Sequence, residues 1–227
     1  MTSTKLNQSY ANRKSAGRIN NQKINPIKRS AAKFYTYKNF AATILNKFKY
    51  IKGFYMRVTH GIKPLFSNAW AASQKIFNKN DSETERLNRV ANVIGGRVAD
   101  NINNPDSSTK WVNTCAVRMS YILNYSGLKI KPNGKLTVSG SDKNWYYYRV
   151  TNLISFLISE WGKPESIKYP AVIGRKGIIL FQVSGWSNAN GHATLFDGNS
   201  CYDHCYFSEN EPEKGYVTLQ ANFWELK

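Results

Sequence analysis

The sequence predicts an α+β domain behind a basic N-terminal extension. Helical patterns fill the middle of the chain, and strand-length apolar runs follow near residues 177–183 and 191–196. Helices first and antiparallel strands second is the order of an α+β domain. A chain of 227 residues, 41% of them hydrophobic, can build one sizeable core plus a tail. We therefore predict an extension over residues 1–61 and one domain over residues 62–227.

Charge separates these two parts. The chain has 32 Lys and Arg against 14 Asp and Glu, and residues 1–80 hold 16 of the basic residues and none of the acidic ones. Residues 81–227 are therefore nearly neutral, with a net charge of +2. Binding to polyanions is expected only of the basic part. Because no base-reading motif accompanies the charge, no specific nucleic acid partner is predicted.

Within the extension, residues 1–32 lack periodicity and are predicted to be disordered. Residues 39–58 have helical spacing of large apolar side chains, with most lysines off that stripe. One interpretation is a basic amphipathic helix that contacts an anionic membrane. The other is a helix that packs on the neighbouring domain. Neither a membrane-spanning run of about 18 apolar residues nor a Sec signal peptide is recognisable.

The first helices of the domain are predicted from residue 82 onward, after a segment of 61–80 that leads into the domain. Ser82 and Glu85 form a capping-box pattern at a helix start. Apolar residues with helical spacing continue to Val98, although Gly95-Gly96 either interrupts this helical face or packs it closely. Residues 101–108 have the composition of a loop.

A second helix is predicted over residues 115–125, with Gly127 as its C-terminal cap. Residues 128–138 then read as a hairpin around a turn at 132–134. After an aromatic cluster at 145–148, Thr151 is the expected cap of a helix that runs to Trp161 and ends before Gly162.

The sequence pattern of the C-terminal part is typical of β-strands. The runs at 177–183 and 191–196 are continuous and apolar, and Asp197-Gly198 is the expected turn after the second one. Residues 201–207 and 215–220 are candidates for two further strands.

Cys115 is the candidate nucleophile. It follows the polar pair Asn113-Thr114 and opens an apolar helix. A thiol with a reference pKa of about 8.5 is mostly protonated at neutral pH. A helix N-terminus favours the thiolate, and its backbone N–H group can help to hold an oxyanion. Taken alone, however, such a cysteine is more often a small buried core residue.

His192 is the candidate base, because it lies early in a predicted strand after a glycine that gives access to it. His204 and His60 are weaker choices. A third group must orient the imidazole. If the strand turns at 197–200 and returns, Asp203 becomes a diagonal neighbour of His192, so it is preferred to Asp197, which lies in the turn.

The remaining cysteines, Cys201 and Cys205, leave two alternatives open. Cys201 and Cys205 could form a disulfide, which would leave Cys115 as a free and reactive cysteine. Such a disulfide would imply an oxidising compartment. A disulfide needs Cα atoms within about 7 Å, whereas four residues of straight strand span about 13 Å. Either both thiols are free or the segment curls around Asp203. The spacing does not fit a usual zinc site, so no metal or cofactor is predicted.

Three blocks of sequence carry a resemblance to a known family. They are residues 113–124 around Cys115, residues 191–198 around His192, and the segment Cys201-Tyr202-Asp203-His204-Cys205. Together they resemble the fourth family of type VI secretion amidase effectors. The resemblance covers roughly residues 62–227 and leaves the basic extension outside.

The resemblance implies a small papain-like domain of the NlpC type that is injected into the periplasm of rival bacteria. It implies cleavage of peptidoglycan stem peptides between D-glutamate and meso-diaminopimelate. Cys115 would be the nucleophile, His192 the base and Asp203 the orienting residue, with a Cys201–Cys205 disulfide that favours the curled segment. A cognate immunity protein and a component of the secretion apparatus would be its partners.

Two other classes of function remain as hypotheses. One is a non-enzymatic protein that binds membranes or polyanions through its basic extension, and it predicts an inert Cys115. The other is a related cysteine hydrolase with a different amide substrate.

Overall fold

The computed structural model describes residue 43 and residues 61–187, 189–207 and 215–227. The predicted disordered segment 1–32 lies outside the described residues, as does all of the predicted helix 39–58 except Thr43. The boundary between residues 61 and 62 stays a prediction. Among the described residues, no helix is both long enough and apolar enough to cross a membrane.

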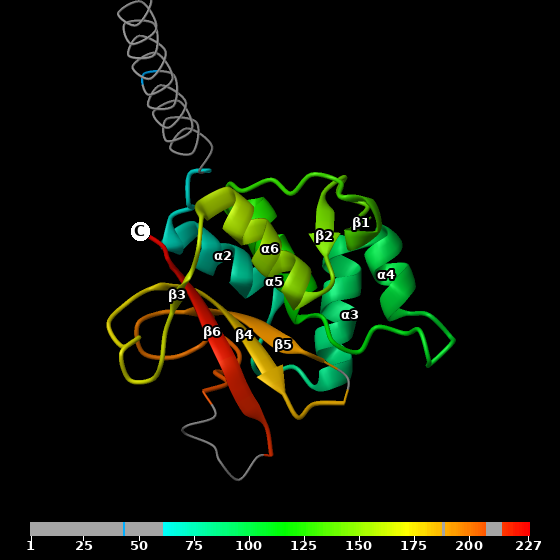
Figure 1. Cartoon of the computed structure of the whole chain (residues 1–227). Helices are drawn as coiled ribbons and strands as arrows, with labels where there is room; N and C mark the ends of the chain where they lie inside the picture. The colour runs from blue at the N-terminus through cyan, green and yellow to red at the C-terminus, as the bar shows by residue number, and fades with distance from the viewer. Residues whose placement is uncertain (1–42, 44–60, 188, 208–214) are drawn as a thin grey trace, which may run out of the picture. The chain divides into compact units, whose positions relative to one another are not determined.

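Helices pack beside a four-stranded antiparallel sheet, as the sequence predicts (Figure 1). The strands of this sheet lie in the order β3-β6-β4-β5, and β1 and β2 form a separate pair. The helices are α2 (Phe66–Ile76), α3 (Glu83–Ile94), α4 (Gly96–Ile102), α5 (Cys115–Ser126) and α6 (Val150–Trp161). The strands are β1 (Thr137–Ser139), β2 (Trp145–Tyr147), β3 (Glu165–Ser166), β4 (Gly177–Ser184), β5 (Gly191–Phe196) and β6 (Val217–Glu225).

The central strand β4 is apolar on both faces because both faces are covered. Ile178 and Leu180 belong to the core that includes the helices, whereas Ile179 and Phe181 belong to a second core on the opposite face. Side chains alternate between the faces of a strand, so this division follows directly from the sequence. A continuous apolar run is the pattern expected of such a doubly covered strand.

Helix α5 runs through the larger core. All of its residues except Tyr125 are buried, and it packs against α2, α6, β2 and β5. It ends at Gly127, whose φ of 121° is a conformation that side-chain-bearing residues rarely adopt. This burial fixes the position of the first turn, where Cys115 lies.

The start of α3 and the break after it agree with the prediction. Ser82 accepts a hydrogen bond from the backbone of Glu85, and the Glu85 carboxylate accepts one from the backbone of Ser82. Gly95 then separates α3 from α4 with a φ of 64°. The glycine pair is therefore a true interruption between two helices.

The hairpin predicted over residues 128–138 is wrong. Residues 134–136 form a 3-10 turn, and β1 instead pairs with β2 across residues 140–144. Asp142 holds this turn by accepting hydrogen bonds from the backbone of Asn144 and from the hydroxyl groups of Tyr125 and Tyr146. The aromatic cluster is thus the returning strand of the hairpin.

Three smaller predictions also need correction. Arg149, not Thr151, is the N-cap of α6, and no side chain caps this helix. Residues 201–207 form no strand beyond an isolated bridge between Phe196 and Cys201. The segment at 61–80 contains the helix α2, which the sequence pattern did not reveal, and the short strand β3 was also missed.

Candidate active site

Cys115 is the first residue of α5 and is 3% exposed. The N-cap residue Thr114 makes no capping hydrogen bond through its side chain. The backbone N–H of Cys115 instead donates to Oδ1 of Asn113 at 3.3 Å. The thiol lies 3.8 Å from the carbonyl oxygen of Gly191, which brings α5 and β5 together at the site.

Gly191 allows β5 to pack closely against β4. A Cβ atom at this position would lie 2.2 Å from the carbonyl oxygen of Phe181 on the neighbouring strand. Any side chain would therefore push β5 away from β4. The glycine that was expected to give access to His192 has this second role in the packing of the sheet.

His192 is buried on β5 opposite Phe181. Its Nε2 atom lies 2.9 Å from Oδ2 of Asp203, and its ring also hydrogen bonds to the thiol of Cys115. Because Nε2 bonds to Asp203, Nδ1 is the ring nitrogen that remains available to the thiol. The ring packs edge-on against Tyr206, with ring centroids 4.8 Å apart.

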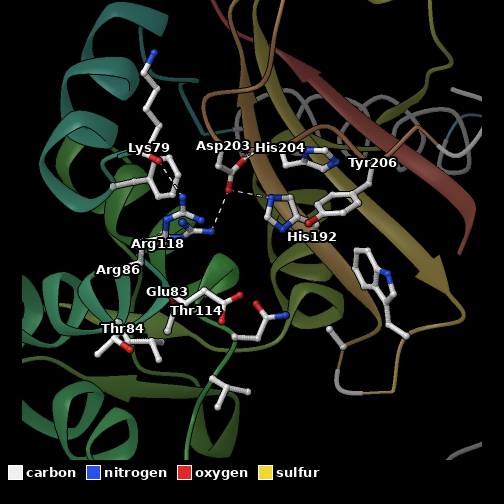
Figure 2. Close-up of a pocket in the computed structure, with 16 residues that line it drawn as sticks. Lys79, Glu83, Thr84, Arg86, Thr114, Arg118, His192, Asp203, His204 and Tyr206 are labelled. Carbon is white, nitrogen blue, oxygen red and sulfur yellow. Dashed lines mark hydrogen bonds and ion pairs between the residues drawn. The ribbon is translucent and has the colours of Figure 1, made fainter. Parts of the chain in front are cut away.

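Asp203 accepts four hydrogen bonds, two at each carboxylate oxygen. Oδ2 accepts from His192 at 2.9 Å and from Arg118 at 3.0 Å, as Figure 2 shows. Oδ1 accepts from the hydroxyl of Thr194 at 2.6 Å and from the backbone N–H of His204 at 2.7 Å. A carboxylate with this many donors stays ionised and has a fixed orientation.

The segment that carries Asp203 is curled and closed by a disulfide. Cys201 and Cys205 are bonded with their Cα atoms 5.3 Å apart, a separation that excludes a straight strand. The competing residue Asp197 lies in the preceding turn, where it accepts hydrogen bonds from the backbone of Asn199 and Ser200. Of the two acids, the structure places Asp203 beside His192.

Arg118 is a site residue to which the sequence pattern assigned no role. It lies one turn after Cys115 on α5 and is 8% exposed. Its guanidinium packs over the ring of Phe77 at 4.7 Å and bonds to Asp203. The available signal was a charged residue in a stretch otherwise expected to be buried, since buried arginines are almost always paired.

The charges of the four groups support one another. Burial acts to raise the pKa of the Cys115 thiol, but His192 and then Arg118 outweigh it and hold this pKa below its usual value. Burial acts to lower the pKa of His192, yet Asp203 raises it to about 9. Burial also opposes ionisation of Asp203, whose pKa His192 and Arg118 nevertheless lower to about 2. Near neutral pH the site therefore holds an imidazolium, a carboxylate and a guanidinium, and the two cations favour the thiolate form of Cys115.

The other histidines do not take the place of His192. His204 contributes its backbone N–H to Asp203, and its ring packs against Tyr206. His60 lies outside the described residues. Among the residues that the structure describes, no group of three or more His, Cys, Asp or Glu side chains is arranged to hold a metal ion.

Of the cavities at the site, one is lined by His192 and another by Cys115. The histidine-side cavity has a volume of about 610 Å³ and is lined by His192, Asp203 and Arg118, among others (Figure 2). The cysteine-side cavity has a volume of about 630 Å³ and is lined by Cys115 and Gly191, among others. Both are large enough for one residue of a peptide or a small ligand group.

Helices packed on an antiparallel sheet, with a cysteine at the start of the buried helix and a histidine on the facing strand, define a papain-like domain of the NlpC type. The family described as "Type VI secretion system (T6SS), amidase effector protein 4" (Tae4) matches residues 111–224. The chain belongs to this family and is an amidase effector that acts on peptidoglycan. This membership excludes the non-enzymatic hypothesis for the domain.

Solved structures agree with this assignment. The chain is 36% identical to the effector Tae4 from Salmonella typhimurium, solved in complex with the immunity Tai4 from Enterobacter cloacae, over 73% of this chain and 100% of that one (TM-score 0.61). It is 37% identical to the type VI effector Tae4 from Enterobacter cloacae over 74% of this chain and 99% of that one (TM-score 0.61). No curated protein sequence matches the chain.

Proposed function

We propose that Cys115 is the nucleophile, His192 the general base and acid, and Asp203 the orienting residue of this amidase. The observation that carries the proposal is the continuous series of contacts from the thiol through the imidazole to the carboxylate. A nucleophile next to a base that is itself oriented by a third group is the arrangement that nucleophilic amide hydrolysis requires.

The reaction would proceed in two halves. The Cys115 thiolate attacks the amide carbonyl, and the His192 imidazolium donates its proton to the leaving nitrogen, which leaves a thioester on Cys115. Water then attacks the thioester while neutral His192 accepts its proton, and the thiolate departs. The N–H of Cys115 would stabilise the oxyanion once substrate displaces its bond to Asn113.

We further propose that the scissile bond joins the γ-carboxyl group of D-glutamate to meso-diaminopimelate in the stem peptide. Membership of the Tae4 family supports this choice of bond. The site of action would be the periplasm of a target bacterium, reached through the type VI secretion apparatus. The Cys201–Cys205 disulfide suits that oxidising compartment.

The solved complexes of relatives support a proposed partner. Tae4 proteins from Enterobacter cloacae and Salmonella typhimurium were solved with Tai4 immunity proteins. We expect a cognate immunity protein to block the cavities beside Cys115 and His192. A component of the secretion apparatus and an anionic membrane that contacts residues 39–58 remain predicted partners.

The test is digestion of purified sacculi, with the products identified by mass spectrometry. The wild-type protein should produce two kinds of fragment: one that ends in D-glutamate and another that begins with diaminopimelate. Cys115→Ala should reduce release by at least about 10³-fold, because the nucleophile is lost. Its thermal unfolding should stay close to wild type, since a small side chain replaces a small one. If the Cys115→Ala variant digested sacculi at the wild-type rate, Cys115 would not be the nucleophile.

A further inference from the structure

The two cavities beside the site differ in charge. The cysteine-side cavity is lined by two cations, Lys110 and Arg149, and by no acid among the described residues. The histidine-side cavity mixes cations such as Lys79 and Arg86 with the acids Glu83 and Asp203 (Figure 2). Apart from the Cys115 thiol, the charged side chains that line the cysteine-side cavity are positive and favour an anionic group, whereas a mixed cavity suits a group that carries both signs.

Arg149 is held in place without an ionic partner in the part of the chain that the structure describes. It is the N-cap residue of α6, so the helix fixes its backbone. Its guanidinium lies over the ring of Tyr148, 5.7 Å from the centroid, and Tyr148 stacks on Trp111 with ring centroids 5.0 Å apart. Trp111 and Tyr148 also line the cavity. The stack orders the guanidinium and leaves its N–H groups available to a ligand.

The chemistry of the proposed reaction sets the direction in which a substrate lies. The acyl group becomes bonded to Cys115, whereas the leaving amine receives its proton from His192. The two cavities meet at their shared residues Val112, Asn113 and Ala189. The acyl residue therefore belongs in the cysteine-side cavity, and the leaving residue belongs in the histidine-side cavity.

From the cavity, its charge and this direction, we infer that Arg149 binds the free α-carboxylate of the acyl residue and selects substrates that carry this charge. The inference rests on the proposed function, in which the acyl residue is a γ-linked D-glutamate. A planar guanidinium can bind a carboxylate through two parallel hydrogen bonds. The zwitterionic leaving residue, diaminopimelate, matches the mixed charges of the histidine-side cavity.

The experiment compares two synthetic peptides, L-Ala-γ-D-Glu-diaminopimelate and the same peptide with the glutamate α-carboxylate replaced by a carboxamide. The wild-type protein should cleave the carboxylate peptide with a kcat/KM about 10- to 100-fold higher, the range of a charge-assisted hydrogen bond. Arg149→Gln should lose most of this preference by slowing cleavage of the carboxylate peptide alone. An unchanged rate on the carboxamide peptide shows that the variant is folded.

Lys79→Gln is the matched control, because it removes one cation from the other cavity. It should keep the wild-type ratio of the two kcat/KM values. A wild-type ratio in Arg149→Gln, or equal cleavage of both peptides by the wild-type protein, would overturn the inference and leave the proposed function standing. If the wild-type protein cleaves neither peptide, the proposed bond is wrong, and the inference fails with it.

Discussion

The site is assembled from two regions of different kinds. Cys115 and Arg118 lie on α5, a helix that is buried on all sides and fixed by core packing. Asp203 lies in a short curled segment that is fixed by a disulfide and by hydrogen bonds to its one carboxylate. The position of the proposed nucleophile thus depends on the hydrophobic core, whereas that of the proposed orienting acid depends on local covalent and polar contacts.

This difference predicts how each region responds to damage. Small changes in the core around α5 alter the stability of the whole domain, because packed interiors relax only partially. Changes in the curled segment should instead impair catalysis while most of the fold persists. Single substitutions at residues of the site distinguish an effect on the stability of the domain from an effect on catalysis alone.

Among the substitutions that test this comparison, the largest effect is expected for Asp203→Asn. The amide keeps the shape of the carboxylate but not its charge, so the imidazolium loses the partner that raises its pKa to about 9. Loss of the orienting acid of a triad costs up to about 10⁴-fold in rate, and we expect at least about 10²-fold here. The measurement is kcat/KM on a soluble stem peptide, with circular dichroism as the check of folding.

Asp197→Asn is the matched control, since it alters an acid of the adjoining turn whose hydrogen-bond donors are the backbone N–H groups of Asn199 and Ser200 and the Ser200 hydroxyl. It should retain activity within about threefold of wild type, because neither of its partners belongs to the site. A loss of activity in Asp197→Asn as large as that in Asp203→Asn would show that the segment as a whole, and not the acid at its centre, governs catalysis.

The positions of Cys115 and His192 could be predicted from the sequence because local sequence patterns determine the helix and the strand that carry them. The polar pair before Cys115, the apolar pattern after it and Gly127 at its end specify one buried helix. The position of His192 on a strand was predicted in the same way, from the apolar run of strand length over residues 191–196. The structure places both residues where these patterns predict, and it brings their side chains into contact.

The position of Asp203 could not be predicted fully, because the conformation of its segment depends on contacts between residues that are distant in the sequence. Strand register alone would have made Asp203 a diagonal neighbour of His192 on a straight strand, but the disulfide curls this segment. The resemblance, rather than spacing, favoured the curl. Arg118 escaped assignment because its role depends on the meeting of α5 with a residue 85 positions later. The misplaced hairpin failed for a similar reason, since Asp142 and its tyrosines fix the turn.

Removal of the disulfide should have the next largest effect. Replacing Cys201 and Cys205 together with serine frees the segment around Asp203, and we expect kcat/KM to fall about 10- to 100-fold. The closed loop is very short, so chain entropy limits the loss of stability to about 2 kcal/mol. Denaturant unfolding monitored alongside activity tests both statements. Wild-type activity in the double variant would show that the hydrogen bonds alone hold Asp203.

The wild-type pH profile should be bell-shaped. Activity needs the thiolate and the imidazolium, so it should fall above about pH 9 as His192 loses its proton. On the acid side it should fall as Cys115 becomes protonated, below the usual thiol pKa. Stability follows the sign of each shift: the contribution of Asp203 is lost between about pH 4 and pH 2, and that of His192 between about pH 6.5 and pH 9. A basic limb near pH 7 would contradict this assignment.

The smallest effect, a displacement of this profile, is expected for Arg118→Met. The guanidinium favours the thiolate and shares Oδ2 of Asp203 with His192. Loss of its positive charge should raise the pKa of both Cys115 and His192, which moves both limbs about one pH unit upward. The rate of alkylation by iodoacetamide, measured against pH, follows the acid limb directly.

Arg118→Lys is the matched control because it retains the charge, and its limbs should stay within about half a unit of wild type. If Arg118 served packing alone, Arg118→Met would lower the alkylation rate or the stability without moving either limb. A displaced profile in Arg118→Met that Arg118→Lys restores would instead show that α5 supplies both the nucleophile and the charge that keeps it ionised. The core-fixed helix would then determine the chemistry of the thiol, and the curled segment would determine only the orientation of its base.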